Sequence, residues 1–306
     1  MNIPCYPQSR NIRFEDKSFL DALLRSLQPR VSECSFANLF LFRHAHFYRL
    51  TRVEDSFVVL GRGYNGEAYF LPPLGEDVDD ALSILLPDGL VLYGCDESFV
   101  DSYLAALKDI EITEERDAFD YLYFRRDLAE LPGNRYHKKK NRVNYFESRH
   151  VYTVEPFSQD HREGALRLLE EWLRIRSEVE SPSLRPEVAA CAEAVEIAGL
   201  LGLEGVVILV EGTLRAFVLG ERLNNDTSVC HFLKADPFME GLYQLADREF
   251  NRRCFSDCTY VNREQDLGEP NLRSSKLSYH PCELVKKYRA WKSFSGIDNP
   301  AIPRLF

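Results

Sequence analysis

The 306-residue sequence lacks the features that mark membrane-spanning and secreted proteins. It contains no run of about 18 apolar residues, so we expect no membrane-spanning helix. Its first ten residues, MNIPCYPQSR, contain no apolar core of the kind that a signal peptide requires. These absences predict a cytoplasmic protein.

Regularly spaced cysteines are also lacking. The eight cysteines are scattered, and one close pair, Cys254 and Cys258, is too little for a zinc site. Scattered cysteines in a chain without a secretion signal are typical of reduced thiols that pack as small hydrophobic side chains. We therefore predict no metal centre and no disulfide framework.

Net positive charge is also lacking: 38 basic residues stand against 48 acidic ones, and the formal net charge of -10 argues against a general nucleic-acid binder. The exception is the segment LPGNRYHKKKNRVNYF at 131–146 and the residues just after it. Between residues 134 and 149, six basic residues face one acid, Glu147, which gives a local formal charge of +5. The basic residues are Arg135, Lys138, Lys139, Lys140, Arg142 and Arg149. Such a local reversal of sign indicates an anionic partner.

Pro132 and Gly133 form a break near the start of this segment, and Asn134 is placed to cap a helix that starts near Arg135. At 100° per residue, one side of that helix is apolar, with Tyr136, Val143 and Phe146. Lys139 and Lys140 lie at the two edges of this side, where a lysine must extend to solvent or meet a buried anion. The alternative is an ordinary solvated basic helix.

Hydrophobic periodicity divides the chain into two mixed halves, and 306 residues suit two domains of about 150. In the first half we expect helices at 16–27, 77–86 and 97–107, and strands at 47–52, 56–60, 67–71, 90–93 and 118–124. In the second half we expect strands at 151–157, 205–210, 214–221, 227–234, 258–262 and 283–291, and helices at 161–178, 186–199, 241–253 and 270–275. A capping box from Asp160 to Glu163 and a Pro186 at the first helical position support the helix starts. The pattern predicts an α+β or α/β domain with a mixed sheet.

The order of elements in the second half resembles the fold of the GCN5-related N-acetyltransferases. Four segments look more closely like one branch: LPGNRYHKKKNRVNYF, HFLKAD, GLYQLADREF and YVNREQDLGEPNLRSSKLSYHPCELVKKY. They resemble the C-terminal domain of phosphatidylglycerol lysyltransferases and its stand-alone, mostly uncharacterised relatives. The resemblance extends over nearly the whole chain.

That resemblance implies an α+β protein with two tandem acyltransferase-like domains, each a mixed, mostly antiparallel sheet flanked by helices. The expected parts are a degenerate N-terminal domain at 1–130, a basic linking helix at 131–150 and a C-terminal domain at 151–306. Related enzymes move an aminoacyl group from a charged tRNA to a lipid headgroup or a peptidoglycan precursor. Membrane-bound members carry a transmembrane region ahead of this domain, and no such run occurs here, so the acceptor stays open: a small molecule, a peptide or a lipid headgroup.

The segment that corresponds to the pyrophosphate loop of acetyl-CoA enzymes departs from their pattern. That loop is rich in glycine and cradles phosphate at a helix N-terminus. Here KADPFMEGLY at 234–243 has one glycine, Gly241, and two acids, Asp236 and Glu240. Acids repel a pyrophosphate, so ordinary acetyl-CoA binding is disfavoured. Lys234 is the only cation in this segment.

The chemistry of acyl transfer requires orientation of two substrates, removal of a proton and stabilisation of an oxyanion. The polar run at 262–268 follows a strand, and in this fold it lies near the cleft where the sheet splays. If the strand continues, Glu264 and Asp266 share one face and serve as general base or bind an ammonium group. The alternative is a turn closed by Asp266. Arg273, Lys276 and Tyr279 suit contacts with phosphate, carboxylate or an oxyanion, although Tyr279 can instead anchor the last strand and Lys276 can pair with Asp266.

The candidate residues divide into two sets. The catalytic set is Glu264, Asp266 and Tyr279. The substrate- or anion-binding set is Lys138, Lys139, Lys140, Asn141, Arg142, Lys234, Tyr243, Asn262, Arg273 and Lys276. His231 is interpreted as a core residue of its strand, and Tyr243 and Gln244 as residues that combine packing with cleft lining.

Three functions fit these residues. The first is an acyl- or aminoacyl-transferase whose donor is an aminoacyl-tRNA, bound at its acceptor stem, or an acyl-CoA. The second is a non-enzymatic anion- or nucleotide-binding protein on a decayed transferase fold. The third is an acetyl-CoA-dependent N-acetyltransferase, which predicts measurable binding of CoA.

Overall fold

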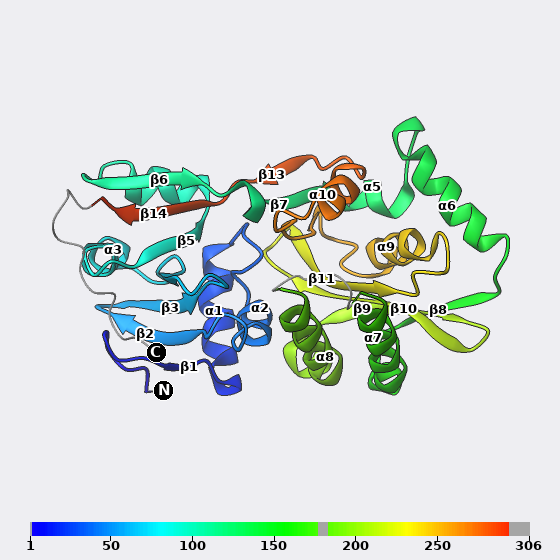
Figure 1. Cartoon of the computed structure of the whole chain (residues 1–306), viewed down its shortest axis with the longest axis horizontal. Helices are drawn as coiled ribbons and strands as arrows, with labels where there is room; N and C mark the ends of the chain where they lie inside the picture. The colour runs from blue at the N-terminus through cyan, green and yellow to red at the C-terminus, as the bar shows by residue number, and fades with distance from the viewer. Residues whose placement is uncertain (1, 177–182, 294–306) are drawn as a thin grey trace. The chain divides into compact units, whose positions relative to one another are not determined.

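The computed structural model in Figure 1 describes residues 2–176 and 183–293. The chain divides into two compact units: Met1–Asp120 with Val285–Phe306, and Tyr121–Leu284. These boundaries differ from those expected at residues 130 and 150, because residues 121–150 belong to the second unit and the chain from Val285 returns to the first. The last two residues of the helix expected at 161–178 lie outside the described residues.

The first unit contains a seven-stranded sheet in the order β1-β2-β3-β4-β5-β14-β6. Neighbouring strands are antiparallel except for β4 and β5, which are parallel. The strands are β1 (Arg10–Asn11), β2 (Arg49–Val53), β3 (Ser56–Arg62), β4 (Ala68–Phe70), β5 (Val91–Cys95), β6 (Ile110–Glu114) and β14 (Tyr288–Lys292). The helices are η1 (Phe14–Asp16), α1 (Lys17–Leu27), α2 (Phe36–Leu41), α3 (Val78–Leu85), α4 (Glu97–Phe99), η2 (Val100–Leu104) and η3 (Arg116–Ala118).

The second unit contains a sheet in the order β13-β7-β12-β11-β10-β9-β8. Strand β11 is parallel to β12, whereas β7 with β12 and the neighbours from β8 to β11 are antiparallel. The strands are β7 (Asp120–Phe124), β8 (Tyr152–Pro156), β9 (Glu204–Val210), β10 (Thr213–Arg222), β11 (Thr227–Ala235), β12 (Tyr260–Asn262) and β13 (Glu283–Val285). The helices are α5 (Arg125–Glu130), η4 (Asn134–Tyr136), α6 (His137–Glu147), η5 (Gln159–His161), α7 (Arg162–Arg176), α8 (Leu184–Leu201), α9 (Leu242–Arg253) and α10 (Pro270–Leu277).

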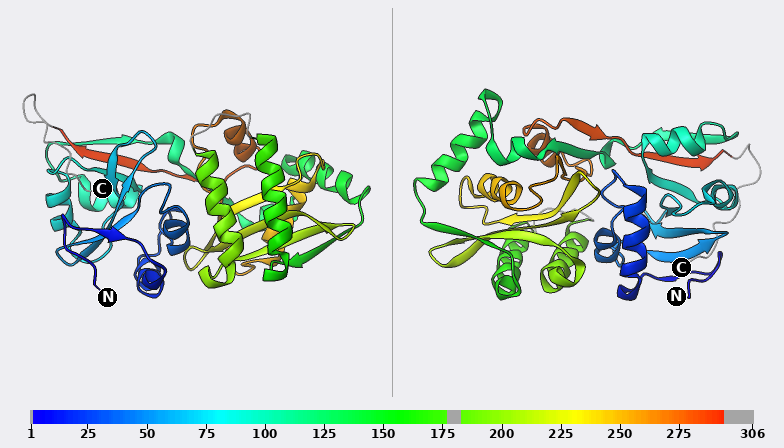
Figure 2. Two further views of the ribbon diagram at one scale, coloured as in Figure 1. Left: turned by 60° about the horizontal axis from the view of Figure 1, so that its bottom comes forward. Right: turned by 180° about the vertical axis from the view of Figure 1, so that it is seen from behind.

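Helices cover both faces of the second sheet. Helices α7 and α8 lie on one face and α9 lies on the other, as Figures 1 and 2 show. Apolar side chains of β9, β10 and β11 pack with α9 and with the buried side of α6 in one core. Alternation of apolar residues over 204–235 fixes which side chains meet α9, because successive strand residues point to opposite faces. The fold class predicted from the sequence, α+β with two mixed and mostly antiparallel sheets flanked by helices, is confirmed.

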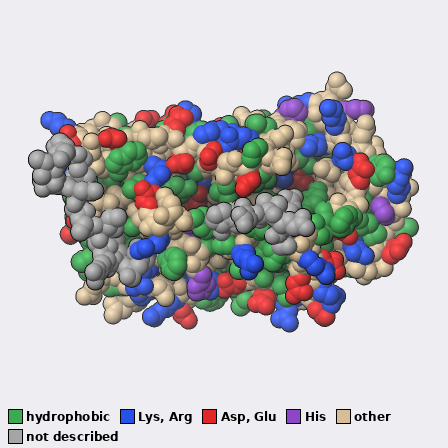
Figure 3. All heavy atoms as spheres, viewed as in Figure 1, with side chains coloured by type: hydrophobic (Ala, Val, Ile, Leu, Met, Phe, Trp, Pro, Cys, Tyr) green, Lys and Arg blue, Asp and Glu red, His purple; other side chains and the backbone are tan. Residues whose placement is uncertain are grey.

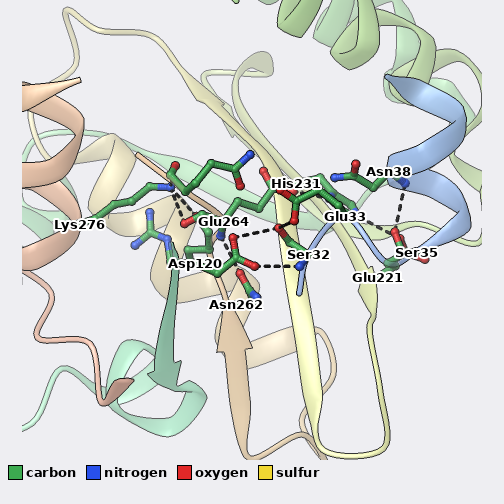
Figure 4. Close-up of polar contacts among 12 residues, drawn as sticks. Ser32, Glu33, Ser35, Asn38, Asp120, Glu221, His231, Asn262, Glu264 and Lys276 are labelled. Carbon is green, nitrogen blue, oxygen red and sulfur yellow. Dashed lines mark hydrogen bonds and ion pairs between the residues drawn. The ribbon is translucent and has the colours of Figure 1, made fainter. Parts of the chain in front are cut away.

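The last strand was predicted wrongly. The single strand expected at 283–291 is two strands, β13 and β14, which belong to different sheets. Between them Lys287 is completely buried in the first unit, where its Nζ donates to Asp120 at 2.7 Å and to Glu33 at 2.5 Å. Ser32 also donates to Asp120, through its backbone N–H at 2.8 Å and its hydroxyl at 3.0 Å, as Figure 4 shows. A buried ammonium requires such partners, and they fix where β14 begins.

The helix starts also differ in detail. Helix α6 begins at His137 after the short helix η4, and Gly133 rather than Asn134 precedes η4. The capping box before α7 joins Ser158 and His161 instead of Asp160 and Glu163. Pro186 is the third residue of α8, which starts at Leu184.

Helix α6 has the predicted apolar side. Tyr136, Val143 and Phe146 are buried, with exposed fractions of 1% or less. Of the two lysines expected at its edges, Lys139 is half-buried and Lys140 is exposed. Among the described residues, no helix combines the length and the apolar character needed to cross a bilayer.

Candidate functional site

A bulge in β11 lies beside the point where β11 and β12 separate. The two parallel strands pair only over Thr227–Val229 and Tyr260–Asn262. In the register with β10, Phe232 faces Leu219 and Cys230 faces Gly220, so His231 is an additional residue. A bulge of this kind locally disrupts the ladder and redirects a side chain.

The redirected imidazole of His231 lies between two carboxylates, as Figure 4 shows. Its Nδ1 is 2.8 Å from Glu264 Oε1 and its Nε2 is 2.9 Å from Glu221 Oε1. The histidine side chain is 1% exposed, whereas Glu221 and Glu264 keep 13% and 19% of their side chains exposed. Burial lowers the pKa of His231, but the hydrogen bonds to Glu221 and Glu264 outweigh it and raise the pKa to about 10. This raised pKa favours an imidazolium between the two carboxylates at neutral pH, and the cluster reaches solvent through the carboxylates.

The turn after β12 presents Glu264 to this histidine. Glu264 adopts a left-handed backbone conformation (φ 55°), and its N–H donates to Asn262 Oδ1 at 2.7 Å. Lys276 Nζ donates to the carbonyl oxygens of Arg263, Glu264 and Gln265 at 2.6, 3.0 and 2.5 Å. The strand does not continue in an extended conformation, because an Asx-type turn and three carbonyl contacts bend the chain. The alternative, a turn closed by Asp266, is confirmed by the Gly268 and Glu269 N–H groups, which donate to Asp266.

Asp266 lies apart from Glu264 and has different partners. It is completely buried and accepts from Arg273 Nε at 2.9 Å, Arg273 Nη2 at 2.7 Å, Tyr121 Oη at 2.5 Å and the Gly268 N–H at 2.9 Å. Burial raises the pKa of Asp266, but these hydrogen bonds, led by that of Arg273, outweigh it and lower the pKa to about 2. The ion pair of Asp266 is made by Arg273 and not by Lys276, whose ammonium group donates to backbone carbonyls instead. Such a carboxylate suits an anchor of the turn better than a general base.

Tyr279 has cations against its ring. It is 4% exposed, with Lys139 Nζ 4.0 Å and the Arg263 guanidinium carbon 4.9 Å from its ring centroid. Arg263 also pairs with the buried Asp247 of α9 at 3.1 Å, and Lys139 Nζ donates to Ser278 Oγ at 2.7 Å. Burial, followed by the positive charge of Arg263, lowers the pKa of Lys139 to about 8. This cluster joins α6, α9 and the end of α10.

The exposed face of α6 forms a shallow depression of about 330 Å³. It is lined by Lys138, Asn141, Arg142, Tyr145 and Glu240. Arg142 pairs with Glu240 at 2.7 Å. Lysine and arginine side chains are spread over α6 on the face that Figure 3 shows. Three predicted anion-binding residues therefore share one surface.

Lys234 and Tyr243 lie in a different place. The Lys234 ammonium is buried, 2.5 Å from Glu187 Oε1 and 3.8 Å from the centroid of the Trp172 ring. Trp172 in turn donates from Nε1 to Tyr243 Oη at 2.7 Å. The lysine thus joins β11 to α7 and α8, and it is occupied by its own protein partners.

The N-terminus of α9 is covered by α6. A Cβ on Gly241 would lie 2.1 Å from the carbonyl oxygen of Arg142, and the glycine has a φ of 93°. In the first turn, the Leu242 N–H donates to Met239 O at 3.1 Å. Glu240 and Asp236 flank this turn, so the region offers little that a pyrophosphate needs.

Three residues of these clusters were missed or underrated. His231 was interpreted as a core residue and is indeed buried with both ring nitrogens hydrogen-bonded, but its position between two acids was not foreseen. Glu221 interrupts an apolar strand, AFVLGER, and that interruption was the available signal. Asp247 lies within the apolar stripe of α9, where an acid must find a cation such as Arg263.

The two mixed sheets and the splayed parallel pair are features of an acyltransferase-like fold. The model of the phosphatidylglycerol lysyltransferase C-terminal family matches residues 24–291, and the chain belongs to that family. Membership of this family supports an acyl- or aminoacyl-transferase-like role.

Solved structures agree with this fold. A conserved protein of unknown function from Bacteroides thetaiotaomicron has a TM-score of 0.84 at 28% identity, over 92% of this chain and 98% of that chain. The C-terminal domain of a protein described as a lysylphosphatidylglycerol synthetase from Agrobacterium fabrum has a TM-score of 0.63 at 11% identity, over 92% and 94% of the two chains.

One curated relative is an uncharacterized protein from Mycoplasmoides gallisepticum, which is 27% identical over 218 residues. The match covers 70% of this chain and 66% of that relative.

Proposed function

We propose that this chain transfers an activated acyl or aminoacyl group to an amine or hydroxyl acceptor, with Glu264 as the proton acceptor. The observation that carries the proposal is the Glu221–His231–Glu264 cluster at the separation of β11 and β12. An aminoacyl ester is already activated, so the protein needs to orient the reactants and remove one proton. No covalent nucleophile is required.

In this mechanism the carboxylate of Glu264 takes the proton of the attacking group as the new bond forms. His231, held by Glu221, fixes the orientation of the Glu264 carboxylate and compensates part of its charge. Asn262 and Lys276 hold the turn in place. Asp266, Arg273 and Tyr279 are assigned to positioning, since each is held by neighbouring side chains.

An aminoacyl-tRNA is the donor that the charge distribution favours. The α6 depression presents Lys138, Asn141 and Arg142, which suit contacts with a phosphate backbone. Tyr145 in the same depression is 39% exposed, and the Arg149 guanidinium carbon lies 3.6 Å from its ring centroid, which adds a cation to this surface. Acyl-CoA is disfavoured because α6 and the acids at 236 and 240 occupy the start of α9. A donor of this class also fits the predicted cytoplasmic location.

The test follows ester loss from tRNA charged with labelled amino acids, in the presence of a panel of amine and hydroxyl acceptors. Glu264→Gln should reduce turnover about 100- to 1,000-fold, which is the contribution of a well-placed general base. Glu269→Gln is the matched control, because Glu269 is an exposed glutamate five residues further along, directly before α10. Equal turnover by both variants would remove Glu264 from the mechanism, and inertness of the wild type towards every donor would remove the transferase.

A second candidate is an anion- or nucleotide-binding protein without catalysis, and the α6 depression is the observation that favours it. It predicts binding of phosphate-bearing ligands that Arg142→Ala weakens, with no ester turnover. A third, an acetyl-CoA-dependent N-acetyltransferase, predicts that CoA raises the melting temperature. Titration of CoA in a thermal-shift assay separates it from a transferase that uses aminoacyl-tRNA, and we expect no change.

A further inference from the structure

Lys139 differs from the two lysines beside it on α6. Lys138 and Lys140 are exposed, whereas the Lys139 side chain is half-buried against Tyr279 and Ser278. The three residues are consecutive, so they share one backbone, one helix and one overall field. Any difference in their chemistry therefore arises from what the Lys139 amine touches.

The surroundings of the Lys139 amine disfavour its protonated form. The charged and titratable groups that face it are Arg142 of α6, Asp247 of α9, Arg263 of the turn after β12, and Tyr279 after α10. Arg263 and Lys139 approach the same phenol ring, at 4.9 and 4.0 Å from its centroid. Two cations against one ring repel each other, and partial burial adds to the cost of a second charge. Asp247, the acid among these four groups, is already paired with Arg263.

Ser278, which the Lys139 amine contacts, also lines a depression. A depression of about 550 Å³ is lined by Gly268, Pro270, Arg273, Ser274, Leu277 and Ser278. Ser278 is also the hydrogen-bond partner of Lys139, so the amine lies next to a wall of this depression. The formal charge of +5 over residues 134–149 raises the local concentration of anions.

We propose that Lys139 is a site of covalent acylation by small acyl phosphates. The neutral Nζ attacks the carbonyl carbon of the acyl phosphate and forms a C–N bond. The bond between that carbon and the phosphate oxygen breaks, inorganic phosphate leaves with the electron pair, and the surplus amine proton goes to solvent. The product is an amide, and no oxidant, reductant or further reactant is consumed.

Acylation changes the surface that the proposed function uses, although the site does not depend on that function. The amide loses the cation against Tyr279 and no longer donates as an ammonium to Ser278. The formal charge of residues 134–149 falls from +5 to +4. A modified chain should therefore attract phosphate-bearing partners less strongly.

The experiment uses the full chain and acetyl phosphate at about pH 7.5, followed by peptide mapping of the three lysines by mass spectrometry. A pKa of about 8 raises the neutral fraction of Lys139 over that of an ordinary exposed amine by about two orders of magnitude. Partial burial and the weaker nucleophilicity of a less basic amine reduce this advantage by about one order of magnitude. We expect Lys139 to be labelled about tenfold faster than Lys138 or Lys140.

Two further arms make the result decisive. In urea-unfolded chain the three lysines should be labelled at equal rates, because the environment of Lys139 is gone. A neutral acetyl ester of N-hydroxysuccinimide replaces the anionic reagent in the second arm. Equal labelling of the three lysines in the folded chain would overturn the site. If Lys139 were labelled preferentially by the neutral ester but not by acetyl phosphate, the assignment to acyl phosphates would be overturned.

Discussion

The charge on His231 gives the most direct test of the candidate site. Its folded-state pKa of about 10 lies above its ordinary value of 6.5, because two carboxylates hold the proton. A group whose pKa is raised by folding stabilises the folded state fully below the unfolded pKa. That stabilisation is lost as the pH rises through the folded pKa. The window for His231 therefore runs from about pH 6.5 to about pH 10.

The magnitude follows from linkage. The full difference between the two pKa values corresponds to about 5 kcal/mol. Between pH 6 and pH 9, about 3 kcal/mol of it should disappear. His231→Gln keeps a side chain of similar length but does not titrate. The free energy of unfolding of the wild type minus that of His231→Gln should thus fall by about 3 kcal/mol across this range.

Urea unfolding at several pH values measures this difference, and groups common to both proteins cancel. Trp172 belongs to the second unit, so its fluorescence in a Trp291→Phe background reports the unit that contains His231. An NMR titration of the imidazole, assigned by its loss in the variant, reads the pKa directly. A midpoint near 6.5 together with a flat stability difference would refute the charged cluster.

Three further variants test the packing around the site. Gly241→Ala places a methyl group 2.1 Å from the Arg142 carbonyl at positive φ and should cost about 3 kcal/mol or more in urea unfolding. Gly202→Ala, also at positive φ but in open space, should cost only about 1 kcal/mol, and equal costs would contradict the close contact. Asp266→Asn leaves Arg273 without its carboxylate and should cost about 3–5 kcal/mol at neutral pH. Because the pKa of Asp266 is depressed, that difference should shrink as the pH falls from about 4 towards 2, and a difference independent of pH would exclude an ionised Asp266.

Elements with strong periodicity could be predicted from the sequence. The strands β9, β10 and β11 and the buried side of α6 were predicted correctly, because burial of one face imposes a repeat that residues display directly. Strand β6 was not predicted. Its residues Ile110–Glu114 lie at the sheet edge and are mostly exposed, so charge rather than alternation dominates the segment.

The site could be predicted only in part. The sequence identified Glu264 and the half-buried Lys139, because one follows a strand and the other lies at the edge of an apolar stripe. The bulge at His231 adds one residue to a strand, and nothing in an apolar run marks which residue is added. The left-handed turn at Glu264 did have a signal in Asn262, whose side chain accepts from the backbone two residues later.

The position of β14 has a consequence for biosynthesis. Residues 288–292 form an interior strand between β5 and β6, although most of that sheet is encoded before residue 120. A ribosome releases Tyr121–Leu284 before it releases this strand, so the nascent second unit is complete while the first still has a gap. We therefore expect the second unit to fold before the first, although translation of the first begins earlier. A nonsense mutation shortly before codon 288 should leave the first sheet without its interior strand β14.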